Sequence, residues 1–386
     1  KVNFGIVKLC QSIETDHYYT MKILRKVEIL DSRISEHLLN EYKILSRIYH
    51  PFIMQLKGIY TKDPKGLYYL FEFVQGGELA HLLEMNFKLP EDQVRFYAAS
   101  LVTIIDYLHK KNIVNRGITP DNIFLTSSGY IKLTNFYFAK ILKNGYTNTL
   151  CGTPEYSSPE MLNRKGHGKA HDLWSLGIII YHLLIGHTPF EDSDPIKMKE
   201  KILKGKPVYP KILSKNAKNL IKHLLEVDPK KRLGNGKNGI YEIISDPFFK
   251  GFDWVNIKSI KSPAVLTYLK KVVEKNNQKI KEFNNIVYEL KDKVINSIES
   301  TMDKINKWEI NQFKYVNENW KDYEIKDNDP KGFHFAKNSN FISLPETCVP
   351  EGYNGDDIID ILIDYKNNVH FVLQDSQKID VYRGSM

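Results

Sequence analysis

The sequence predicts an α+β, bilobal fold: a small lobe with an antiparallel sheet and one main helix, a larger helical lobe, and a C-terminal helical extension. Strand-like runs rich in branched and aromatic residues dominate the chain up to residue 73, where a Gly76-Gly77 pair breaks the pattern. Long amphipathic segments follow as far as residue 254. A chain of 386 residues accommodates one domain of roughly 250 residues and an appendage.

The small lobe is expected to span 1–73. Strands are expected at 4–9, 18–24, 52–60 and 67–73. Between the second and third strands, apolar residues near one face predict a helix over 32–48. Because the chain begins with Lys and not Met, we expect this lobe to be incomplete at its start.

The larger lobe is expected to span 74–254 and to contain helices near 91–110, 172–186 and 215–226. Its longest apolar stretch has about ten residues, which is too short to span a bilayer. The three cysteines lie far apart and show no metal-ligand spacing, which indicates a reducing compartment. We therefore expect a cytoplasmic protein, or one in an intracellular assembly such as the cytoskeleton.

Residues 255–310 are expected to form an amphipathic or coiled-coil-like helix. Apolar residues recur there at alternating gaps of three and four, most clearly at Ile280, Phe283, Val287, Leu290, Val294 and Ile298. This helix either packs back on its own domain or binds a partner, and the pattern does not separate the two. In the tail, 311–386, two strand-like runs (358–365 and 369–374) flank a turn and predict a hairpin.

The net charge of +9 suits nucleic acid, a membrane surface or acidic protein partners. The chain has no dense Lys/Arg block and no aromatic-basic ladder, which favours a merely solvated basic surface. We accordingly expect no nucleic-acid partner and no membrane partner.

An ordered set of motifs covers about two thirds of the chain. CGTPEYSSPE occupies 151–160, HDLWSLG contains Asp172, and RLGNGKNG (232–239) is followed by FDW (252–254). In this order the motifs resemble those of the AGC group of Ser/Thr protein kinases, close to the cyclic-nucleotide-dependent kinases. The resemblance implies a protein-kinase-like fold in which Asp172 braces the catalytic loop. It also implies an ion pair between Glu160 and Arg232.

The resemblance further implies a nucleotide site, which would be vestigial here. FGIV at 4–7 is similar to the end of a glycine-rich loop, Lys22 to the lysine that holds the phosphates, and Glu41 to its helix partner. FEFVQGGEL (71–79) resembles the hinge that binds adenine. The site residues implied are Gly5, Val7, Lys22, Glu41, Glu72, Val74 and Phe124.

Phosphoryl transfer requires a carboxylate to orient the hydroxyl and hard anionic oxygens for Mg²⁺. The catalytic loop reads NRGITPDN, so Gly117 stands where the family has its catalytic aspartate and Thr119 where it has a lysine. Asn135 replaces the metal-binding aspartate, and Asn122, the second metal ligand, is retained. Only a weak, vestigial metal site is implied.

Further departures affect the loops and the adenine slot. Tyr137 replaces a glycine after the metal-binding position, and Val2 replaces a glycine of the phosphate loop. Thr20 and Phe124 are larger than the residues usual above and below the adenine ring, and Phe71 occupies the gatekeeper position. The retained pair of Lys22 and Glu41 either binds phosphate or serves as a structural ion pair, and both interpretations stay open.

The resemblance also suggests a regulatory pair and a peptide groove. Arg116 could bind a phosphorylated Thr149, or it could bond to backbone carbonyls beside an unmodified threonine. Glu78 and Glu155 persist where relatives recognise basic substrates, whereas His182 replaces a third acidic residue. A basic peptide could dock there without being phosphorylated.

We interpret the chain as a pseudokinase, not an enzyme, that acts as a scaffold or interaction module and requires no cofactor. Its expected partners are proteins, bound through the C-terminal helix and the kinase-like surface. One alternative is a Ser/Thr kinase with weak or unconventional ATP-dependent phosphotransfer. Another is an ATP-sensing switch that binds ATP without turnover and without efficient use of Mg²⁺.

Overall fold

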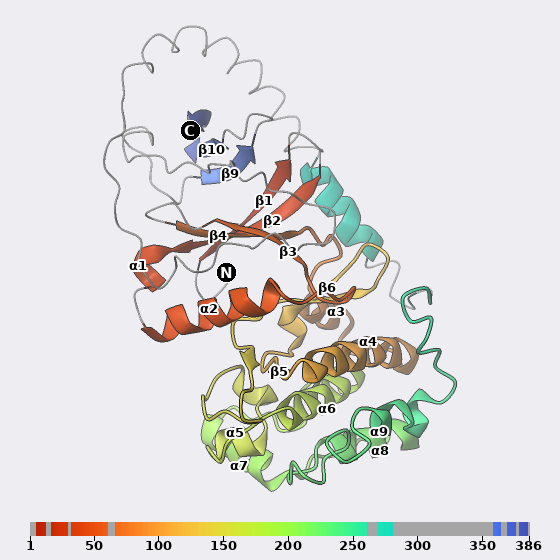
Figure 1. The fold of residues 1–386 in the computed structure, drawn as a ribbon. Coiled ribbons are helices and arrows are strands. Elements are labelled where there is room, and N and C mark those ends of the chain that lie inside the picture. Colours follow the sequence, from red (N-terminus) through yellow and green to blue (C-terminus); the bar gives the residue numbers. More distant parts are fainter. Residues whose placement is uncertain are drawn as a thin grey trace, which may run out of the picture. The chain divides into compact units, whose positions relative to one another are not determined.

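The computed structural model describes 5–12, 17–29, 32–60, 66–260, 262, 269–280, 358–363, 369–375 and 378–384 (Figure 1). The described chain divides into two compact units. The first comprises Lys1–Arg25, Lys57–Leu70 and Asn277–Met386. The second comprises Lys26–Leu56 and Phe71–Asn276.

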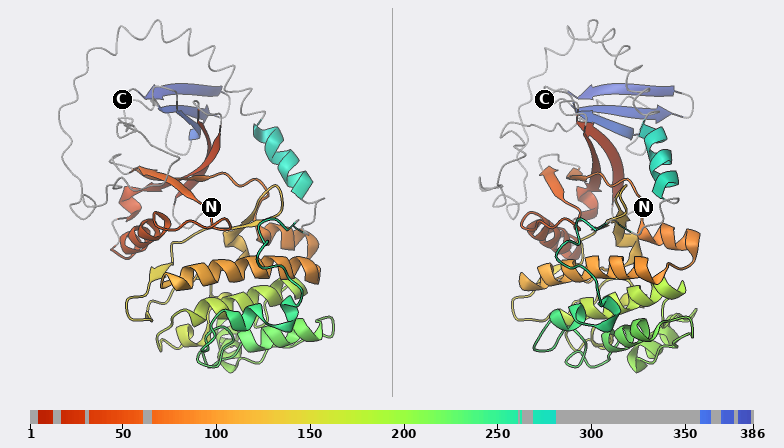
Figure 2. Two further views of the ribbon diagram at one scale, coloured as in Figure 1. Left: turned by 45° about the vertical axis from the view of Figure 1, so that its right-hand side comes forward. Right: turned by 90° about the vertical axis from the view of Figure 1, so that its right-hand side faces the viewer.

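A seven-stranded sheet dominates the first unit, with strand order β11-β10-β9-β1-β2-β4-β3. The strands are β1 (Ile6–Ser12), β2 (Tyr18–Arg25), β3 (Leu56–Tyr60), β4 (Gly66–Glu72), β9 (Ile358–Ile363), β10 (Val369–Asp375) and β11 (Lys378–Gly384). β1 and β2 run antiparallel, from Ile6 opposite Ile23 to Gln11 opposite Tyr18. β9 pairs in parallel with β1, and Figure 2 shows β9–β11 as an antiparallel group.

The third strand begins later than the expected 52–60. Residues 52–54 pair instead with Leu133, whose N–H donates to the Phe52 carbonyl and whose carbonyl accepts from the Met54 N–H. These contacts divert the backbone, so β3 starts at Leu56. β9 and β10 coincide with the two strand-like runs of the tail, whereas β11 was not expected.

The second unit is mainly helical. Its longer helices are α2 (Ser32–Leu45), α3 (Leu79–Asn86), α4 (Glu91–Lys110), α6 (Ala170–Ile185), α7 (Pro195–Lys204) and α8 (Lys215–Leu224). Its short helices are α1 (Lys26–Ile29), α5 (Pro159–Leu162) and α9 (Tyr241–Ile244). The short strands β5 (Ile113–Val114) and β8 (Lys140–Ile141) pair, as do β6 (Ile123–Leu125) and β7 (Ile131–Leu133).

Helix α6 forms the centre of the core. It packs against α4 on one side and α8 on the other, and every residue except His182 is buried. This full burial explains its nearly continuous apolar sequence, because a helix enclosed by protein has no solvent-facing polar stripe. Gly177 lies where α8 approaches, since a Cβ there would come within 2.9 Å of Leu224.

The α+β fold with an antiparallel sheet and a helical lobe is confirmed. Of the C-terminal helix expected over 255–310, residues 269–280 are helical, but 255–260 form turns and bends, so the expected start of this helix was wrong. The rest of its heptad run lies outside the described residues, as does Val2. The domain boundaries that we drew from the sequence stay predictions. Among the described helices, none is both long and apolar enough to cross a bilayer.

Candidate active site

The loop between β5 and β6 is held by a buried carboxylate at the start of α6. Asp172 accepts hydrogen bonds from the N–H groups of Asn115 and Arg116, each at 3.0 Å. Its Oδ2 also lies 2.9 Å from Nε2 of His109. Burial opposes ionisation of Asp172, but the bonds from His109 and the Arg116 backbone leave its pKa below the usual value.

Arg116 adopts a left-handed backbone conformation, with φ of 61°, which is strained for an arginine. The bond from its N–H to Asp172 helps to fix this conformation. The buried side chain donates from Nε to the Phe138 carbonyl at 2.8 Å and from Nη1 to the Thr149 carbonyl at 3.4 Å. Nη1 also lies 3.4 Å from Nε2 of His167. Arg116 therefore anchors the following segment through two backbone carbonyls.

Gly117 is buried. By resemblance it stands where the family has its catalytic aspartate. Its N–H donates to Oδ1 of Asn115 at 3.0 Å, and its carbonyl accepts from Nδ2 of Asn122 at 2.8 Å. A Cβ built on Gly117 would meet nothing nearer than Asn115 Oδ1, at 3.5 Å. A Cβ at this position would therefore make only ordinary van der Waals contacts, so packing at the Cβ does not require a glycine.

Asn122 and Asn135 bind to each other. Nδ2 of Asn135 donates to Oδ1 of Asn122 at 3.0 Å, and the Asn135 Oδ1 accepts from the Tyr137 N–H at 3.4 Å. Both residues are neutral, and their amides continue the hydrogen-bond chain from the Gly117 carbonyl. Mg²⁺ favours anionic oxygens, so these residues do not fit a strongly bound Mg²⁺. The described residues contain no group of His, Cys, Asp and Glu that could hold a metal.

Tyr137 packs against helix α2. Its ring centroid lies 4.9 Å from that of His37 and 5.0 Å from that of Phe138. The sequence suggested only that a tyrosine here would stiffen the turn. The structure adds an aromatic cluster of Tyr137, His37 and Phe138 that joins this turn to α2.

The expected nucleotide residues fall in both units. Gly5 precedes β1 with φ of 112°, and Val7 is exposed on that strand. Lys22 is buried on β2, with Nζ 5.7 Å from the Tyr69 ring centroid. In the second unit Glu41 is buried on α2. Lys22 and Glu41 lie in different units, so their ion pair stays a prediction.

Glu72, the carboxylate of the expected hinge, makes hydrogen bonds that the motifs did not predict. Glu72 accepts two bonds from Lys132 Nζ, at 2.7 and 2.9 Å, and one from the Gln55 N–H at 2.8 Å. Val74 follows in the hinge, and Phe124 on β6 forms an isolated bridge with Glu78. Thr119, expected in place of a phosphate-clamping lysine, is buried.

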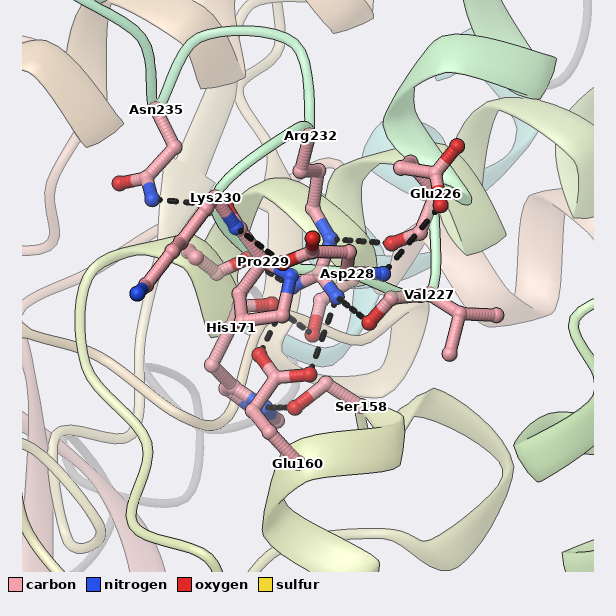
Figure 3. Close-up of polar contacts among 12 residues, drawn as sticks. Ser158, Glu160, His171, Glu226, Val227, Asp228, Pro229, Lys230, Arg232 and Asn235 are labelled. Atoms are coloured by element: carbon pink, nitrogen blue, oxygen red, sulfur yellow. Dashed lines mark hydrogen bonds and ion pairs between the residues drawn. The ribbon is translucent and has the colours of Figure 1, made fainter.

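The ion pair of the helical lobe is present and fully enclosed (Figure 3). Nη1 and Nη2 of Arg232 donate to the two carboxylate oxygens of Glu160 at 2.7 and 2.9 Å. Arg232 also donates to the carbonyls of Ala170 and Glu226. Burial alone would raise the pKa of Glu160, but the bonds from Arg232 hold it below its usual value.

Two of the residues expected to line a peptide groove, Glu78 and His182, lie close enough to Asp121 for its charge to affect their pKa values. Burial and the nearby charge of Asp121 raise the pKa of Glu78. Nδ1 of His182 lies 2.7 Å from the hydroxyl of Tyr156, and burial lowers the His182 pKa, which favours a neutral ring. Glu155 is exposed beside Tyr156.

Several residues whose side chains contact the site were not predicted from the sequence. They are His37, His109, Asn115, Lys132, His167 and His171. One signal was available, since an Asn two residues before a Gly commonly caps a tight turn through its side chain. The others contact residues far away in sequence and leave no local pattern.

Comparison with known proteins agrees with this arrangement. A family model described as "Protein kinase domain" matches residues 2–249, more than half of the chain. The chain belongs to the protein kinase family. Within this family it is 42% identical over 265 residues to the cAMP-dependent protein kinase catalytic subunit of Schizosaccharomyces pombe, covering 68% of this chain and 52% of that protein.

Two other relatives give the same picture. Identity is 43% over 264 residues to the cAMP-dependent protein kinase catalytic subunit 3 of Drosophila melanogaster, covering 68% and 45% of the two chains. It is 40% over 264 residues to the human cAMP-dependent protein kinase catalytic subunit PRKX, covering 68% and 73%. This kinase-family chain thus spans about half the length of the first two relatives.

Proposed function

We propose that this protein is a pseudokinase, a kinase domain kept as a scaffold or interaction module after loss of phosphoryl transfer. The observation that carries the proposal is the amide chain from the Gly117 carbonyl through Asn122 to Asn135. It occupies the positions at which the family's motif has its base and its metal ligand. A neutral amide neither accepts the hydroxyl proton nor binds Mg²⁺ strongly.

The structural contacts of the family's motifs are present although the catalytic groups are absent, and this difference supports the proposal. Asp172 still braces the loop, Arg116 still anchors the following segment, and Glu160 still pairs with Arg232. These are buried polar contacts, which destabilise a fold when they are left incomplete. A framework retained without its reacting groups is suited to binding proteins. The C-terminal helix and the kinase-like surface are the proposed binding elements.

The leading alternative is a Ser/Thr kinase with weak or unconventional activity. It is favoured by the relatives, whose names describe kinase catalytic subunits, and by the presence of Lys22 and Glu41. The exposed Asp121 is a carboxylate close to Gly117 in sequence. A third candidate, ATP binding without turnover, rests on the same Lys22 and on the hinge.

One experiment separates the three functions. Transfer of labelled phosphate from ATP to a basic peptide is measured with and without Mg²⁺, together with thermal shifts under the same conditions. The S. pombe catalytic subunit serves as the positive control, and Lys22→Ala as the matched variant. We expect no transfer above background. Mg²⁺-dependent transfer that disappears in Lys22→Ala would overturn the pseudokinase proposal, and a thermal shift without transfer would favour the ATP switch.

A further inference from the structure

Charge is divided unevenly along the second unit. Residues 71–194 contain eight lysines and three arginines against thirteen carboxylates, a net charge of −2. Residues 195–240 contain twelve lysines and one arginine against three carboxylates, a net charge of +10. The positive excess therefore belongs to one region and does not reflect a uniform lysine content.

All the lysines of this region are exposed. Helix α7 buries Met198 and Ile202, and α8 buries Ala217, Leu220, Ile221 and Leu224. The other positions of both helices are exposed, apart from the half-buried Leu203. The views of Figures 1 and 2 place α7 and α8 at the end of the second unit away from α2. We call the following lysines the basic face: Lys197, Lys199, Lys201, Lys204, Lys206, Lys211, Lys215, Lys218, Lys222, Lys230, Lys231 and Lys237.

Little of this charge is neutralised within the described part of the chain. Lys201 lies 2.9 Å from Asp192, and Lys204 lies 3.6 Å from Glu200 on the same helix. Lys218 lies 5.4 Å from the ring centroid of Tyr209. For the other lysines of the basic face, no carboxylate of the described residues lies within ion-pair distance. The face is thus suited to a strongly anionic partner.

Large apolar side chains protrude among these lysines. Ile196 is 71% exposed, Val208 75% and Ile212 60%. Two of them lie in the connection between α7 and α8, and the third is in the first turn of α7. Exposed aliphatic side chains near lysines can bind at a membrane interface, because the apolar groups enter the boundary region while the lysines attract anionic lipids.

Lysine predominates over arginine along the whole chain, 47 to 8, and the basic face shares this preference. Arginine is preferred where phosphates, bases or carboxylates are bound in fixed bidentate geometry, and protein interfaces are depleted in lysine. The arginine of this region, Arg232, is buried against Glu160. Lysine suffices at a fluid surface of anionic lipids, because attraction there requires no fixed geometry.

We propose that the basic face binds an anionic membrane surface peripherally, with Ile196, Val208 and Ile212 entering the interface. This inference does not depend on whether the chain transfers phosphate. It departs from our expectation, drawn from the sequence, that the chain has no membrane partner. Each lysine near such a surface strengthens binding by roughly five-fold, so a small group of lysines produces a measurable effect.

Vesicle co-sedimentation of the full chain tests the proposal. Vesicles of phosphatidylcholine with phosphatidylserine are compared with vesicles of phosphatidylcholine alone, at low and high salt. We expect binding only to the anionic vesicles, and less of it at high salt because the attraction is screened. Equal binding to both compositions would overturn the proposal. So would a lack of binding to anionic vesicles, or binding to polyuridylate without binding to the vesicles.

Matched charge reversals locate the surface. The triple variant Lys206→Glu, Lys211→Glu, Lys215→Glu should weaken binding by roughly 100-fold or more. The control triple variant Lys88→Glu, Lys111→Glu, Lys143→Glu alters the net charge equally at exposed positions outside the basic face, and it should weaken binding only slightly. Equal losses in both variants would show attraction by net charge alone and would refute the assignment. Unchanged melting temperatures establish that both variants fold.

A second variant tests the apolar contribution. Val208→Ser with Ile212→Ser leaves every charge in place, and we expect it to weaken binding several-fold at both salt concentrations. Binding identical to that of the wild type would remove these side chains from the interface and contradict the proposal as stated.

Discussion

Nδ2 of Asn135 donates a hydrogen bond to Oδ1 of Asn122 across 3.0 Å, although the two residues are thirteen positions apart. Asn135 reaches this geometry from a left-handed backbone conformation, with φ of 54°. The bond connects two positions that, by resemblance, would both face a metal ion. A carboxylate at position 135 could not donate this bond, whereas one at position 122 could still accept it, so the contact depends on the Asn135 amide.

Restoring the carboxylates tests this dependence. Asn135→Asp combined with Gly117→Asp should produce Mg²⁺-dependent phosphotransfer roughly 10²-fold above the wild-type background, because a positioned base contributes about that much or more. The Cβ of Asp at position 117 meets nothing nearer than 3.5 Å. Labelled-ATP transfer to a basic peptide measures the gain.

The matched control for that variant is Asn135→Asp with Gly117→Asn, which adds a side chain of the same size without the base. It should bind Mg²⁺ more tightly than the wild type does, yet show no gain in transfer. Equal activity of the two variants would contradict the role that we assign to position 117.

Removal of one partner of the Glu160–Arg232 pair should destabilise the fold strongly. Arg232→Met leaves the Glu160 carboxylate buried without its partner, so the free energy of unfolding should fall by about 3–5 kcal/mol. Adding Glu160→Gln should recover part of this loss. Urea unfolding measures both effects, and a double variant less stable than Arg232→Met would contradict the explanation.

Two buried histidines, His167 beside Arg116 and His171 beside Ser158, should make stability pH-dependent. Burial is the main cause that lowers the pKa of His171 to about 4 and that of His167 to about 3. An unfolded histidine has a pKa near 6.5, so the unfolded state binds more protons between pH 6.5 and 4. Stability is therefore complete above pH 6.5 and falls as the pH decreases through this window.

The slope of the free energy of unfolding against pH can be measured. Each neutral buried histidine contributes up to about 1.4 kcal/mol per pH unit. Unfolding measured from pH 7 to 4.5 in wild type and in His171→Asn should show a shallower pH dependence in the variant. A pH dependence unchanged by this substitution would rule out His171 as a source.

The Tyr137 ring should stabilise the docking of α2. Tyr137→Gly removes its contacts with His37 and Phe138 and makes the turn more flexible, so we expect a loss of about 1–3 kcal/mol. Hydrogen exchange of α2 should also accelerate. Tyr137→Phe is the control, because it keeps the ring and should keep α2 protected.

Thr149 should matter less to the resting fold than Arg116 does. Arg116→Met removes the bonds to the Phe138 and Thr149 carbonyls and should destabilise the fold by about 2 kcal/mol or more. Thr149→Ala keeps the accepting carbonyl and should alter stability by less than about 0.5 kcal/mol. Thermal unfolding compares the stability of the two variants. A larger loss of stability in Thr149→Ala than in Arg116→Met would show that the Thr149 side chain matters more to the fold than the Arg116 bonds do.

Helix α4 was predicted at its observed bounds because its apolar period is long and regular. Motif order also indicated the residues of the catalytic loop and the Glu160–Arg232 pair. Helix α7 escaped notice because its buried apolar positions are few. The bonds from Lys132 to Glu72 and from Asn135 to Asn122 could not be predicted from the sequence. They depend on the pairing of β6 with β7 and on the positive φ of Asn135, which are features of the folded chain.

The uneven charge of the second unit has a consequence for how this molecule moves. A body with a net charge of +10 over 195–240 and −2 over 71–194 has a permanent dipole moment. In the field of any anionic object, such a dipole turns the second unit before contact, so that α7 and α8 face that object. Orientation during diffusion would then precede any specific contact, and the encounter rate would fall as salt is added.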